Sequence, residues 1–404
     1  MEKVKLGVIG IGMRGENHLE CIGFCDEAEV VAVCDAYEDR VEKGVSLVQK
    51  HKGNTPTAYL DYKLLLQDKN VDAVLISTGW KQHVSIAIDA MNAGIPVAME
   101  VGAAFSIAEC EALVEKYERT RTPFMLLENC CYDMNELLAT SLVRAGKFGE
   151  VVYCHGAYAH DIRGEIAKGN INRHYRLEEY LHHNCDNYPT HDLGPIAKIL
   201  DINRGNRMVS LVSMSSKSVG LKHYIASRKV EDPALNGVEF MQGDVVTTMI
   251  KCENGETITL TLDTTTPRFY SREFTVKGTK GMFSEDGKRV HIDQAQHIPN
   301  IAHNTHMYMS YLPDEWKNNL DDRISHVGHG LMDVLVLKAF FNALITGAEM
   351  PIDVYDAAAW ISISAISEKS IAEGSTPQQI PDFTRGAYKT RPRKDVLQFP
   401  VVKQ

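Results

Sequence analysis

A glycine-rich turn close to the N-terminus constrains the fold of this chain more than any other stretch of its sequence. Residues 4–9, Val-Lys-Leu-Gly-Val-Ile, predict a short buried strand, and a helix is expected over residues 17–22. The segment between them is Gly10-Ile11-Gly12-Met13-Arg14-Gly15. A strand, a G-x-G-x-x-G turn and a helix in this order are typical of a dinucleotide-binding unit. We therefore expect these six residues to hold a dinucleotide.

Each glycine of the turn has its own expected role. Gly10 allows the tight turn, Gly12 lets the backbone approach a diphosphate, and Gly15 lets the helix pack closely on the strand. The diphosphate would lie at the helix N-terminus, where N–H groups without helical partners favour an anion. The alternative is a glycine-rich turn that binds no ligand.

An acidic residue at the end of the next strand points to the identity of the dinucleotide. Asp35 follows a predicted strand over residues 30–34 and lies twenty residues after Gly15. A carboxylate at this place accepts hydrogen bonds from an adenosine ribose and repels a 2′-phosphate. The sequence therefore predicts NAD rather than NADP as the cofactor.

The composition is that of an ordinary globular protein with room for two domains. Of 404 residues, 44% are hydrophobic and 24% are charged, and the formal net charge is −10. Nucleic acids and anionic membranes both require a basic surface, so neither is expected as a partner. No apolar run is long enough to span a membrane.

Cysteine and histidine usage bounds the compartment and the metal content. Nine cysteines without a C-x-x-C pair indicate free thiols in a reducing compartment rather than a disulfide scaffold or a zinc site. The histidines show no metal-binding spacing, so no metal is expected. The first strand begins at residue 4, which leaves no room for a signal peptide. We expect a cytoplasmic protein, or a periplasmic or secreted one if a leader precedes this numbering.

The order of predicted elements divides the chain into two domains. Strands and helices alternate to about residue 127, as a doubly wound parallel sheet requires. We therefore expect an α/β fold with a Rossmann NAD-binding domain over residues 1–128. Residues 129–404 are expected to form a substrate-binding α+β domain, because strands joined by hairpin-type turns predict a large open, mostly antiparallel sheet. Residues 161–187 and 286–326 are expected to be irregular, and the proline-containing C-terminal tail should wrap the surface.

Several polar residues directly follow the predicted parallel strands. In a doubly wound sheet, ligands bind beyond the carboxyl ends of the strands. The candidates placed there by position alone are Thr78, Trp80, His83, Glu100, Glu128 and Asn129.

The densest polar cluster of the second half is Asn187-Tyr188-Pro189-Thr190-His191-Asp192, at a predicted helix start. Tyr188 and His191 are three residues apart and can point at one spot, where they would offer a hydroxyl and a base to one substrate oxygen. The alternative is a helix cap made by Thr190 or Asp192, with His191 as an ordinary surface residue. The residues alone leave both interpretations open.

Further candidates are weaker when they are taken singly. Tyr158 and His160 alternate with alanines on one predicted strand and therefore face the same side. An aromatic residue on a half-buried strand is more often part of the core than of a site. Arg176 and Tyr270 indicate still less by themselves, because arginine is most often a solvated surface residue.

The glycine turn, the segment from Thr78 to His83 and Gly94-Ile95-Pro96-Val97 resemble the Gfo/Idh/MocA oxidoreductase family. That family usually has Glu-Lys-Pro where this chain has Glu100-Val101-Gly102. The lysine that commonly helps to deprotonate the substrate alcohol is therefore missing. This departure disfavours an ordinary sugar dehydrogenase.

A narrower resemblance runs nearly from end to end and accounts for the departure. The chain is similar to glycoside hydrolase family 109, on the motifs at residues 126–132, 156–161, 187–195, 203–205, 267–272, 354–360 and 381–386. The resemblance implies an NAD-dependent glycosidase, typically an α-N-acetylgalactosaminidase. It also implies a sugar pocket lined by Glu128, Tyr158, His160, Arg176, Tyr188, His191 and Tyr270, with Asn187 beside it.

The resemblance further implies an unusual mechanism in which NAD is not consumed. Oxidation at C3 acidifies the C2 proton, the C1 substituent leaves by elimination, water adds, and the ketone is reduced again. In this scheme His191 with Tyr188 would deprotonate the C3 hydroxyl, Tyr158 or Tyr270 would transfer the C2 proton, and Glu128 would hold a hydroxyl or relay a proton.

Two other functions remain open alternatives, and one partner is expected. The first alternative is a dehydrogenase that releases 3-keto sugars or 3-keto glycosides, and the second is a non-catalytic NAD-binding regulator. The fold alone excludes neither. The open sheet of such proteins often covers its face with a second subunit, so a homo-oligomer, a dimer or higher, is expected.

Overall fold

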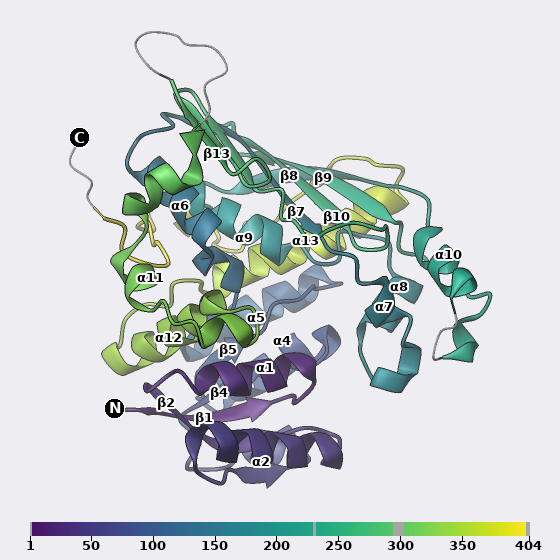
Figure 1. Ribbon diagram of the computed structural model, residues 1–404, viewed down its shortest axis with the longest axis vertical. Helices are drawn as coiled ribbons and strands as arrows, with labels where there is room; N and C mark the ends of the chain where they lie inside the picture. The colour runs from purple at the N-terminus through teal and green to yellow at the C-terminus, as the bar shows by residue number, and fades with distance from the viewer. Residues whose placement is uncertain (1, 229–231, 294–302, 401–404) are drawn as a thin grey trace. The chain divides into compact units, whose positions relative to one another are not determined.

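The computed structural model describes residues 2–228, 232–293 and 303–400, which form two compact units (Figure 1). The first unit comprises Met1–Gly102, Ala108–Asp133 and Glu315–Ala358, and the second comprises Ala103–Ile107, Met134–Asp314 and Ala359–Gln404. The units differ from the division expected at residue 128 mainly because 44 residues from the C-terminal half, Glu315–Ala358, join the first unit, and in addition Ala103–Ile107 belong to the second unit and residues 129–133 to the first. The 44 residues join the first unit because helix α12 (Leu331–Thr346) packs against helix α1 (Met13–Ile22) and strand β1 (Val4–Ile9).

The first unit contains a six-stranded parallel sheet in the order β3-β2-β1-β4-β5-β6. The order reverses between β1 and β4, so the expected doubly wound Rossmann sheet is confirmed. Besides β1, its strands are β2 (Ala28–Cys34), β3 (Thr57–Tyr59), β4 (Ala73–Ile76), β5 (Val97–Met99) and β6 (Phe124–Leu126). The helices between them are α1, α2 (Glu38–Lys52), α3 (Tyr62–Leu65), α4 (Trp80–Asn92) and α5 (Ile107–Thr120).

The second unit contains a nine-stranded sheet in the order β14-β13-β12-β11-β7-β10-β9-β8-β15. All neighbouring pairs are antiparallel except β7 with β10, so the expected mostly antiparallel sheet is confirmed. The strands are β7 (Val151–Ala159), β8 (Met208–Ser215), β9 (Val245–Cys252), β10 (Thr257–Asp263), β11 (Thr275–Gly278), β12 (Gly281–Ser284), β13 (Arg289–Ile292), β14 (His303–Asn304) and β15 (Gln378–Gln379).

One face of this sheet is covered by helices, which include α6 (Met134–Arg144), α9 (Thr190–Ile199) and the later turns of α13 (Val354–Ala372) (Figure 1). Burial alternates along β9, where Thr248 and Ile250 are buried while Thr247 and Met249 are exposed. The helical layer and this alternation show that one face lies against the core and the other is open.

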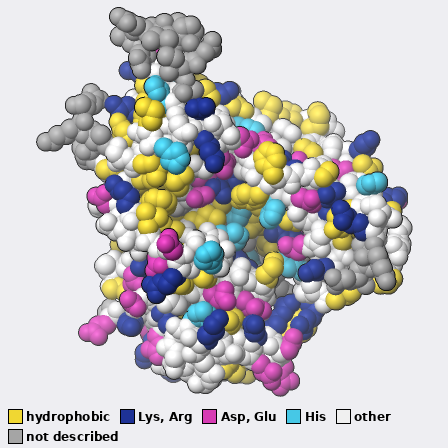
Figure 2. Space-filling view, viewed as in Figure 1, with side chains coloured by type: hydrophobic (Ala, Val, Ile, Leu, Met, Phe, Trp, Pro, Cys, Tyr) yellow, Lys and Arg dark blue, Asp and Glu magenta, His cyan; other side chains and the backbone are white. Residues whose placement is uncertain are grey.

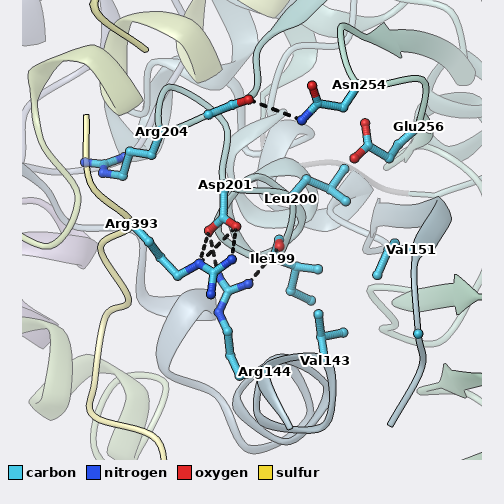
Figure 3. A pocket seen from close by; sticks show the side chains of 12 residues that line it. Val143, Arg144, Val151, Ile199, Leu200, Asp201, Arg204, Asn254, Glu256 and Arg393 are labelled. Atoms are coloured by element: carbon cyan, nitrogen blue, oxygen red, sulfur yellow. Dashed lines mark hydrogen bonds and ion pairs between the residues drawn. The ribbon is translucent and has the colours of Figure 1, made fainter. Parts of the chain in front are cut away.

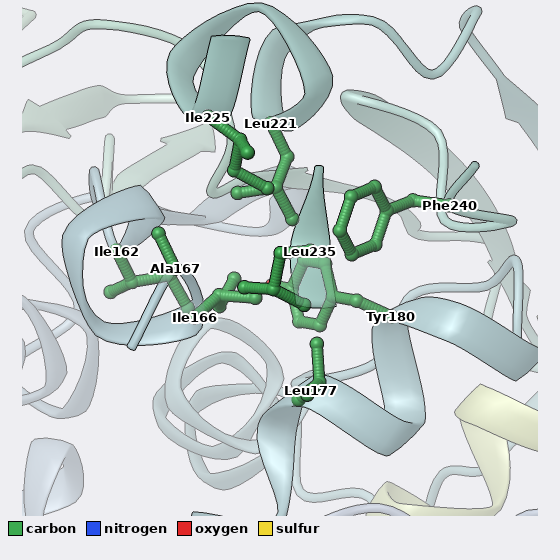
Figure 4. Close-up of a cluster of buried hydrophobic side chains, with 9 residues drawn as sticks. All are labelled: Ile162, Ile166, Ala167, Leu177, Tyr180, Leu221, Ile225, Leu235 and Phe240. Carbon is green, nitrogen blue, oxygen red and sulfur yellow. The ribbon is translucent and has the colours of Figure 1, made fainter. Parts of the chain in front are cut away.

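The sequence predicted an irregular segment over residues 161–187, but the structure shows helices there. This segment contains α7 (Arg163–Ile166) and α8 (Arg176–His182), and α10 (Gly220–Ser227) follows later in the chain. These short helices share a small core of their own (Figure 4), formed by Ile162, Ile166, Ala167, Leu177, Tyr180, Leu221, Ile225, Leu235 and Phe240. Shared burial stabilises helices that are too short to be stable alone.

The second expected irregular region, residues 286–326, also contains regular structure. It includes β13, β14, a 3-10 helix (Thr305–Tyr311) and α11 (Asp314–Asn318), whereas residues 294–302 lie outside the described part of the chain. Strands β13 and β14 extend one edge of the nine-stranded sheet. The prolines of this region had indicated irregular structure, so this strand pairing was not predicted.

The C-terminal tail is fixed to the second unit by ion pairs. Figure 3 shows Arg144 and Arg393 converging on Asp201, which lies 2.9 Å and 2.8 Å from their respective terminal nitrogens. The same Arg144 nitrogen lies 2.8 Å from Asp395 Oδ1. Before these contacts, β15 pairs with β8. The tail therefore runs along the body of its own unit.

The distribution of surface charge and the character of the helices agree with what the composition predicted. On the face shown in Figure 2, acidic and basic side chains are interspersed rather than gathered by sign. Among the described residues, no helix is both long and apolar enough to cross a membrane.

Candidate active site

The glycine turn of the first unit has the shape that a diphosphate requires. Gly10 has φ +94°, and a side chain there would begin 2.6 Å from the backbone of Ser77. A Cβ at residue 15 would lie 2.0 Å from the carbonyl oxygen of Gly10. A Cβ at Gly12 would meet nothing closer than Arg40, at 3.6 Å. The outer glycines thus permit close packing, and the middle one leaves the helix N-terminus open to a ligand.

Two of the three residues that stand between the glycines of the turn, Ile11 and Met13, differ in exposure. Ile11 is fully buried, whereas Met13 is 59% exposed. Ile11 therefore anchors the turn in the core, and Met13 stands on its outer surface.

Asp35 is held rigidly at the end of β2. Its Oδ2 accepts a hydrogen bond from the N–H of Ile11 at 2.7 Å, and its Oδ1 accepts one from the N–H of Tyr37 at 3.1 Å. Arg40 is near, with a nitrogen 3.9 Å from Asp35 Oδ2. The carboxylate is thereby oriented beside the glycine turn, where the ribose of a dinucleotide would be bound. The turn and Asp35 together fit NAD.

The residues after β4 are ordered by contacts within the first unit. His83 lies with Nε2 2.8 Å from the carbonyl oxygen of Thr78, and burial lowers the pKa of this imidazole. Trp80 packs on Gly102, where a Cβ would lie only 2.6 Å from the indole ring. The Trp80 ring therefore explains why glycine stands where related dehydrogenases have the proline of Glu-Lys-Pro.

A buried ionic network surrounds Arg14 and Glu100. The Nε of Arg14 lies 2.6 Å from Glu100 Oε1, and its terminal nitrogens lie 2.6 Å and 2.9 Å from the two oxygens of Asp333. His18 Nε2 lies 2.8 Å from the same Glu100 oxygen. Asn129 donates from Nδ2 to Asp333 Oδ1 at 2.6 Å.

Two members of this network, His18 and Asp333, were missed by sequence analysis. Asp333 comes from α12 and is separated from Arg14 by 319 residues, so no local pattern marks it. His18 follows Arg14 by four residues on α1, a spacing that places both on one helix face. That spacing was the only available signal.

Glu128 lies at the end of β6, as predicted from strand order. Its side chain is fully buried, and its Oε1 accepts a hydrogen bond from the N–H of Cys130 at 3.0 Å. The carboxylate therefore caps the following 3-10 helix (Asn129–Tyr132). Its position is at the carboxyl edge of the parallel sheet, the edge where ligands bind in this fold.

In the second unit, four aromatic candidates form one cluster. The ring centroid of Tyr188 lies 4.4 Å from that of Tyr158 and 4.8 Å from that of His191. Tyr158 Oη lies 3.2 Å from Nδ1 of His160. The expectations that Tyr158 and His160 share one side, and that Tyr188 and His191 point at one place, agree with these distances.

The helix-cap alternative for this cluster does not hold. Helix α9 begins at Thr190 with Pro189 in the capping position, and no side chain caps it. Thr190, His191 and Asp192 are all buried, so His191 is not an ordinary surface residue.

A glycine explains how the helix and the strand bring these rings together. A Cβ at Gly156 of β7 would lie 2.8 Å from the carbonyl oxygen and 2.9 Å from the Cβ of Asp192 in α9. The helix axis can approach the strand this closely only because residue 156 has no side chain. Tyr158 and His191, on the two facing elements, thereby come within 5.6 Å.

Arg176 lies beside the cluster at the start of α8. Its Nε is 2.9 Å from Glu165 Oε1, and its guanidinium carbon lies 5.0 Å from the centre of the Tyr188 ring. Burial opposes the charge, but nearby tyrosines and Glu165 raise the pKa of Arg176 well above its ordinary value. His174 stacks on Tyr175 and lies 3.3 Å from the same Glu165 oxygen.

The last two candidates differ in exposure. Tyr270 is 47% exposed, its hydroxyl accepts a hydrogen bond from Arg272 at 2.9 Å, and its ring lies 5.2 Å from that of His160. Asn187 is fully buried and donates from Nδ2 to Gln242 at 3.1 Å. The bond to Gln242 holds in place the segment that carries Tyr188.

The candidates thus form two groups, one in each unit. The first unit carries the dinucleotide cradle with Glu100 and Glu128, and the second carries a cluster of hydroxyls, imidazoles and one guanidinium. Such a cluster can transfer protons to and from sugar hydroxyls and hold them by hydrogen bonds. The residues of the second group are Tyr158, His160, Arg176, Tyr188, His191 and Tyr270.

Comparison with known proteins identifies relatives over nearly the whole chain. The family "Oxidoreductase family, NAD-binding Rossmann fold" matches residues 4–127, and "Glycosyl hydrolase 109, C-terminal domain" matches residues 132–390. A glycosyl hydrolase family 109 protein of Stenotrophomonas maltophilia is 38% identical, with 96% of this chain and 91% of that protein covered. An α-N-acetylgalactosaminidase of Tannerella forsythia is 34% identical, with 95% and 87% covered.

Among solved structures, a levoglucosan dehydrogenase in complex with NADH and levoglucosan superposes with a TM-score of 0.73 at 18% identity. The match covers 94% of this chain and all of that one. At this identity the likeness concerns the fold alone.

Proposed function

Because this chain belongs to glycosyl hydrolase family 109, we propose that it cleaves N-acetylgalactosaminides or closely related glycosides by transient oxidation at C3 of the sugar. The chain is a glycoside hydrolase with an NAD-binding Rossmann domain. The choice of sugar is supported by the name of the Tannerella forsythia relative. The observation that carries the mechanism is the Tyr158–Tyr188–His191 cluster, which offers acid–base groups in a chain that also binds a redox cofactor.

The residues that would hold NAD are those of the glycine turn together with Asp35. The open N-terminus of α1 fits a diphosphate, and the fixed carboxylate of Asp35 fits a ribose. When bound, NAD supplies the acceptor and donor of the hydrogen at C3, which is chemistry that protein side chains cannot provide. The protein contributes orientation and proton transfer.

His191 and Tyr188 are proposed to take the proton from the C3 hydroxyl. The two rings face one another at 4.8 Å, so a sugar oxygen placed between them could contact both. The guanidinium carbon of Arg176 lies 5.0 Å from the centre of the Tyr188 ring, so a positive charge stands beside this pair. This pair therefore replaces the lysine that is missing from the segment around Val101.

Tyr158 or Tyr270 is proposed to transfer the proton at C2, which becomes acidic once C3 is a ketone. Both tyrosines contact His160, through the Tyr158 hydroxyl at 3.2 Å and the Tyr270 ring at 5.2 Å. His160 can thus orient either phenol and accept its proton. Loss of the C2 proton lets the C1 substituent leave, and water then adds to the unsaturated carbon. Glu128 is proposed to hold a hydroxyl or relay a proton.

A screen of chromogenic glycosides tests this proposal. The substrates are the α- and β-anomers of N-acetylgalactosamine, N-acetylglucosamine, galactose, glucose and mannose. We expect release of the chromophore from at least one N-acetylgalactosaminide, with no lasting rise in NADH absorbance. A lasting rise with a keto product would instead identify a dehydrogenase. Binding of NAD without turnover of any glycoside would identify a regulator.

A homo-oligomer is also proposed, formed through the open face of the nine-stranded sheet. Met214 and Met249 are 65% and 53% exposed on neighbouring strands, although β9 pairs with strands on both sides. Exposed apolar side chains on such a fully paired sheet face favour association with a second copy. Met249→Glu should convert the oligomer to monomer in light scattering, whereas Met307→Glu, at a methionine 66% exposed on a 3-10 helix, should not. An oligomer that survives Met249→Glu would exclude this face.

The cytoplasm is proposed as the location. All nine cysteines are free and buried, which suits a reducing compartment. Cell fractionation of the native host tests this, and recovery in the periplasm or the medium would contradict it.

A further inference from the structure

The network around Arg14 contains more negative than positive charge. Its charged members are Arg14, Glu100 and Asp333, and the side chains of Asn129, His18 and His329 contact them. One guanidinium therefore faces two carboxylates, each within 2.6 Å of an arginine nitrogen. The side chains of Glu100 and Asp333 are 6% and 0% exposed, so solvent screens this excess charge poorly.

Burial and neighbouring charges determine the protonation states of Arg14, Glu100, Asp333 and His18. Burial alone would raise the pKa of Glu100 and of Asp333, but the Arg14 guanidinium holds both below their ordinary value. Burial and Arg14 together lower the pKa of His18, so this imidazole is neutral at neutral pH. Arg14 remains a cation, because the two carboxylates outweigh the effect of burial and raise its pKa. With no proton added to the His329 imidazole, which contacts Arg14 and Asp333, the cluster then carries a net charge of −1.

The local backbone is built to hold Asp333 in this place. A Cβ at Gly328 would lie 2.5 Å from Asp333 Oδ2, so only glycine fits at that residue. The N–H of His329 donates to the same oxygen at 2.8 Å, and Gly330 precedes α12 with φ +74°. The carboxylate therefore accepts hydrogen bonds from the loop, from Asn129 and from Arg14.

The position of the cluster in the sheet places it on the nicotinamide side of the cofactor site. Arg14 lies in the first turn of α1, directly after the glycine turn. Glu100 follows β5 and Asn129 follows β6, whereas Asp35 follows β2 on the other side of β1. A dinucleotide crosses such a sheet at its switch point. With the adenosine ribose at Asp35, the other half of a bound dinucleotide would extend toward β5 and β6.

From this arrangement we propose that the Arg14–Glu100–Asp333 cluster makes the site prefer NAD⁺ over NADH, and that Asp333 is the positioning residue that sets this preference. NADH carries one more negative charge than NAD⁺, so a buried net negative charge disfavours the reduced form. A unit charge acting over about 10 Å at an effective dielectric constant of about 20 changes an affinity roughly tenfold.

This preference serves the proposed reaction, on which the biological interpretation rests. A cofactor that is regenerated in every turnover must begin oxidised and must return its hydrogen readily. Weaker binding of the reduced form achieves both, because it makes the bound reduced cofactor a stronger reductant toward the ketone.

The test measures the cofactor itself and needs no substrate. Holoenzyme is equilibrated at pH 8, well above the ordinary pKa of an imidazole, with a large excess of free NAD⁺ and NADH at known ratio. Free cofactor is then removed by rapid desalting, the protein is denatured, and both released forms are quantified. The bound ratio divided by the free ratio gives the preference for NAD⁺.

Wild-type protein should prefer NAD⁺, and Asp333→Asn should reduce the preference roughly tenfold, because the cluster becomes neutral. Glu100→Gln removes the other carboxylate and should act in the same direction, which keeps the proposal testable if one variant folds poorly. Glu118→Gln is the control: Glu118 accepts a hydrogen bond from Tyr355 elsewhere in the same unit, and its loss should leave the ratio unchanged.

A purely structural role for Asp333 would weaken the binding of both forms and leave their ratio as it is. An unchanged ratio in Asp333→Asn and Glu100→Gln, or a preference that increases, would therefore overturn the proposal. A wild-type protein that retains neither form would count against NAD as the cofactor, whereas a normal preference without glycosidase activity would count only against the proposed function.

Discussion

The ring of Tyr158 lies 5.6 Å from the imidazole of His191, edge to face, although the two residues belong to a strand and a helix that are far apart in the sequence. The contact depends on Gly156, two residues before Tyr158, which lets α9 approach β7 without a side chain between them. The geometry of the proposed acid–base cluster is thus set by a residue that takes no part in the chemistry.

Gly156→Ala should therefore lower activity without touching a catalytic group. The new methyl group would overlap Asp192, and overpacking of this kind costs about 1–3 kcal/mol. Displacement of α9 by a fraction of an ångström should reduce kcat by about tenfold or more. Gly164→Ala is the control, since its Cβ would meet only the hydroxyl of Tyr224, at 3.3 Å. Steady-state kinetics and thermal melting of both variants give the answer, and wild-type kcat in Gly156→Ala would contradict this account of the cluster.

Tyr188→Phe and His191→Ala should each lower turnover by about a hundredfold or more, the usual scale for a positioned acid–base group. Both should retain NAD affinity, because neither residue belongs to the glycine turn. Tyr153→Phe, a tyrosine on the open face of β7, should have wild-type kinetics. If both cluster variants turned over substrate at wild-type rates, the cluster would be structural only.

The parts of the fold that the sequence predicted well are those with strong local signals. The glycine turn, the alternation of strands and helices and the period-two strands gave the parallel sheet and most of the antiparallel one. Helices α7 and α8 were missed because they are short and depend on a core shared with α10, which no local periodicity reveals. The pairing of β13 with β14 was also not predicted, because Pro299 and Pro313 in the same region indicated irregular structure.

The candidate residues also divide into those with a local sequence signal and those brought together only by the fold. Tyr188 with His191, and Tyr158 with His160, could be paired from sequence because each pair lies within three residues. Asp333 could not, because its partners Arg14 and Asn129 are distant in the chain and only the return of α12 to the first unit joins them. The bond from Asn187 to Gln242 is likewise invisible in the sequence, because the two residues are 55 positions apart.

Asp35→Ala should weaken NAD more than it weakens NADP. The substitution removes the ribose acceptor, and it also removes a negative charge that repels a 2′-phosphate. Arg40, which lies 3.9 Å from Asp35, would then be able to pair with such a phosphate. We expect the ratio of the two affinities, measured by calorimetry, to shift by tenfold or more toward NADP. An unchanged ratio would mean that Asp35 only anchors the N–H groups of Ile11 and Tyr37.

Isotope placement separates the proposed elimination from every direct hydrolysis. If the C2 proton is removed in each turnover, a reaction in deuterium oxide should leave deuterium at C2 of the released sugar. Deuterium placed at C3 of the substrate should slow turnover if its transfer limits the rate, and it should largely return to C3. Both outcomes are read by NMR of the product.

A methyl ether at O3 provides the matched chemical control, because that oxygen can no longer become a ketone. Cleavage of this substrate should be abolished, whereas a glycosidase that uses two flanking carboxylates would need no oxidation at C3. Selectivity between anomers should also be looser than in direct hydrolysis, since elimination requires no in-line attack at C1. Cleavage of the 3-O-methyl substrate without exchange at C2 would exclude the redox mechanism, even if NAD is bound in the glycine turn.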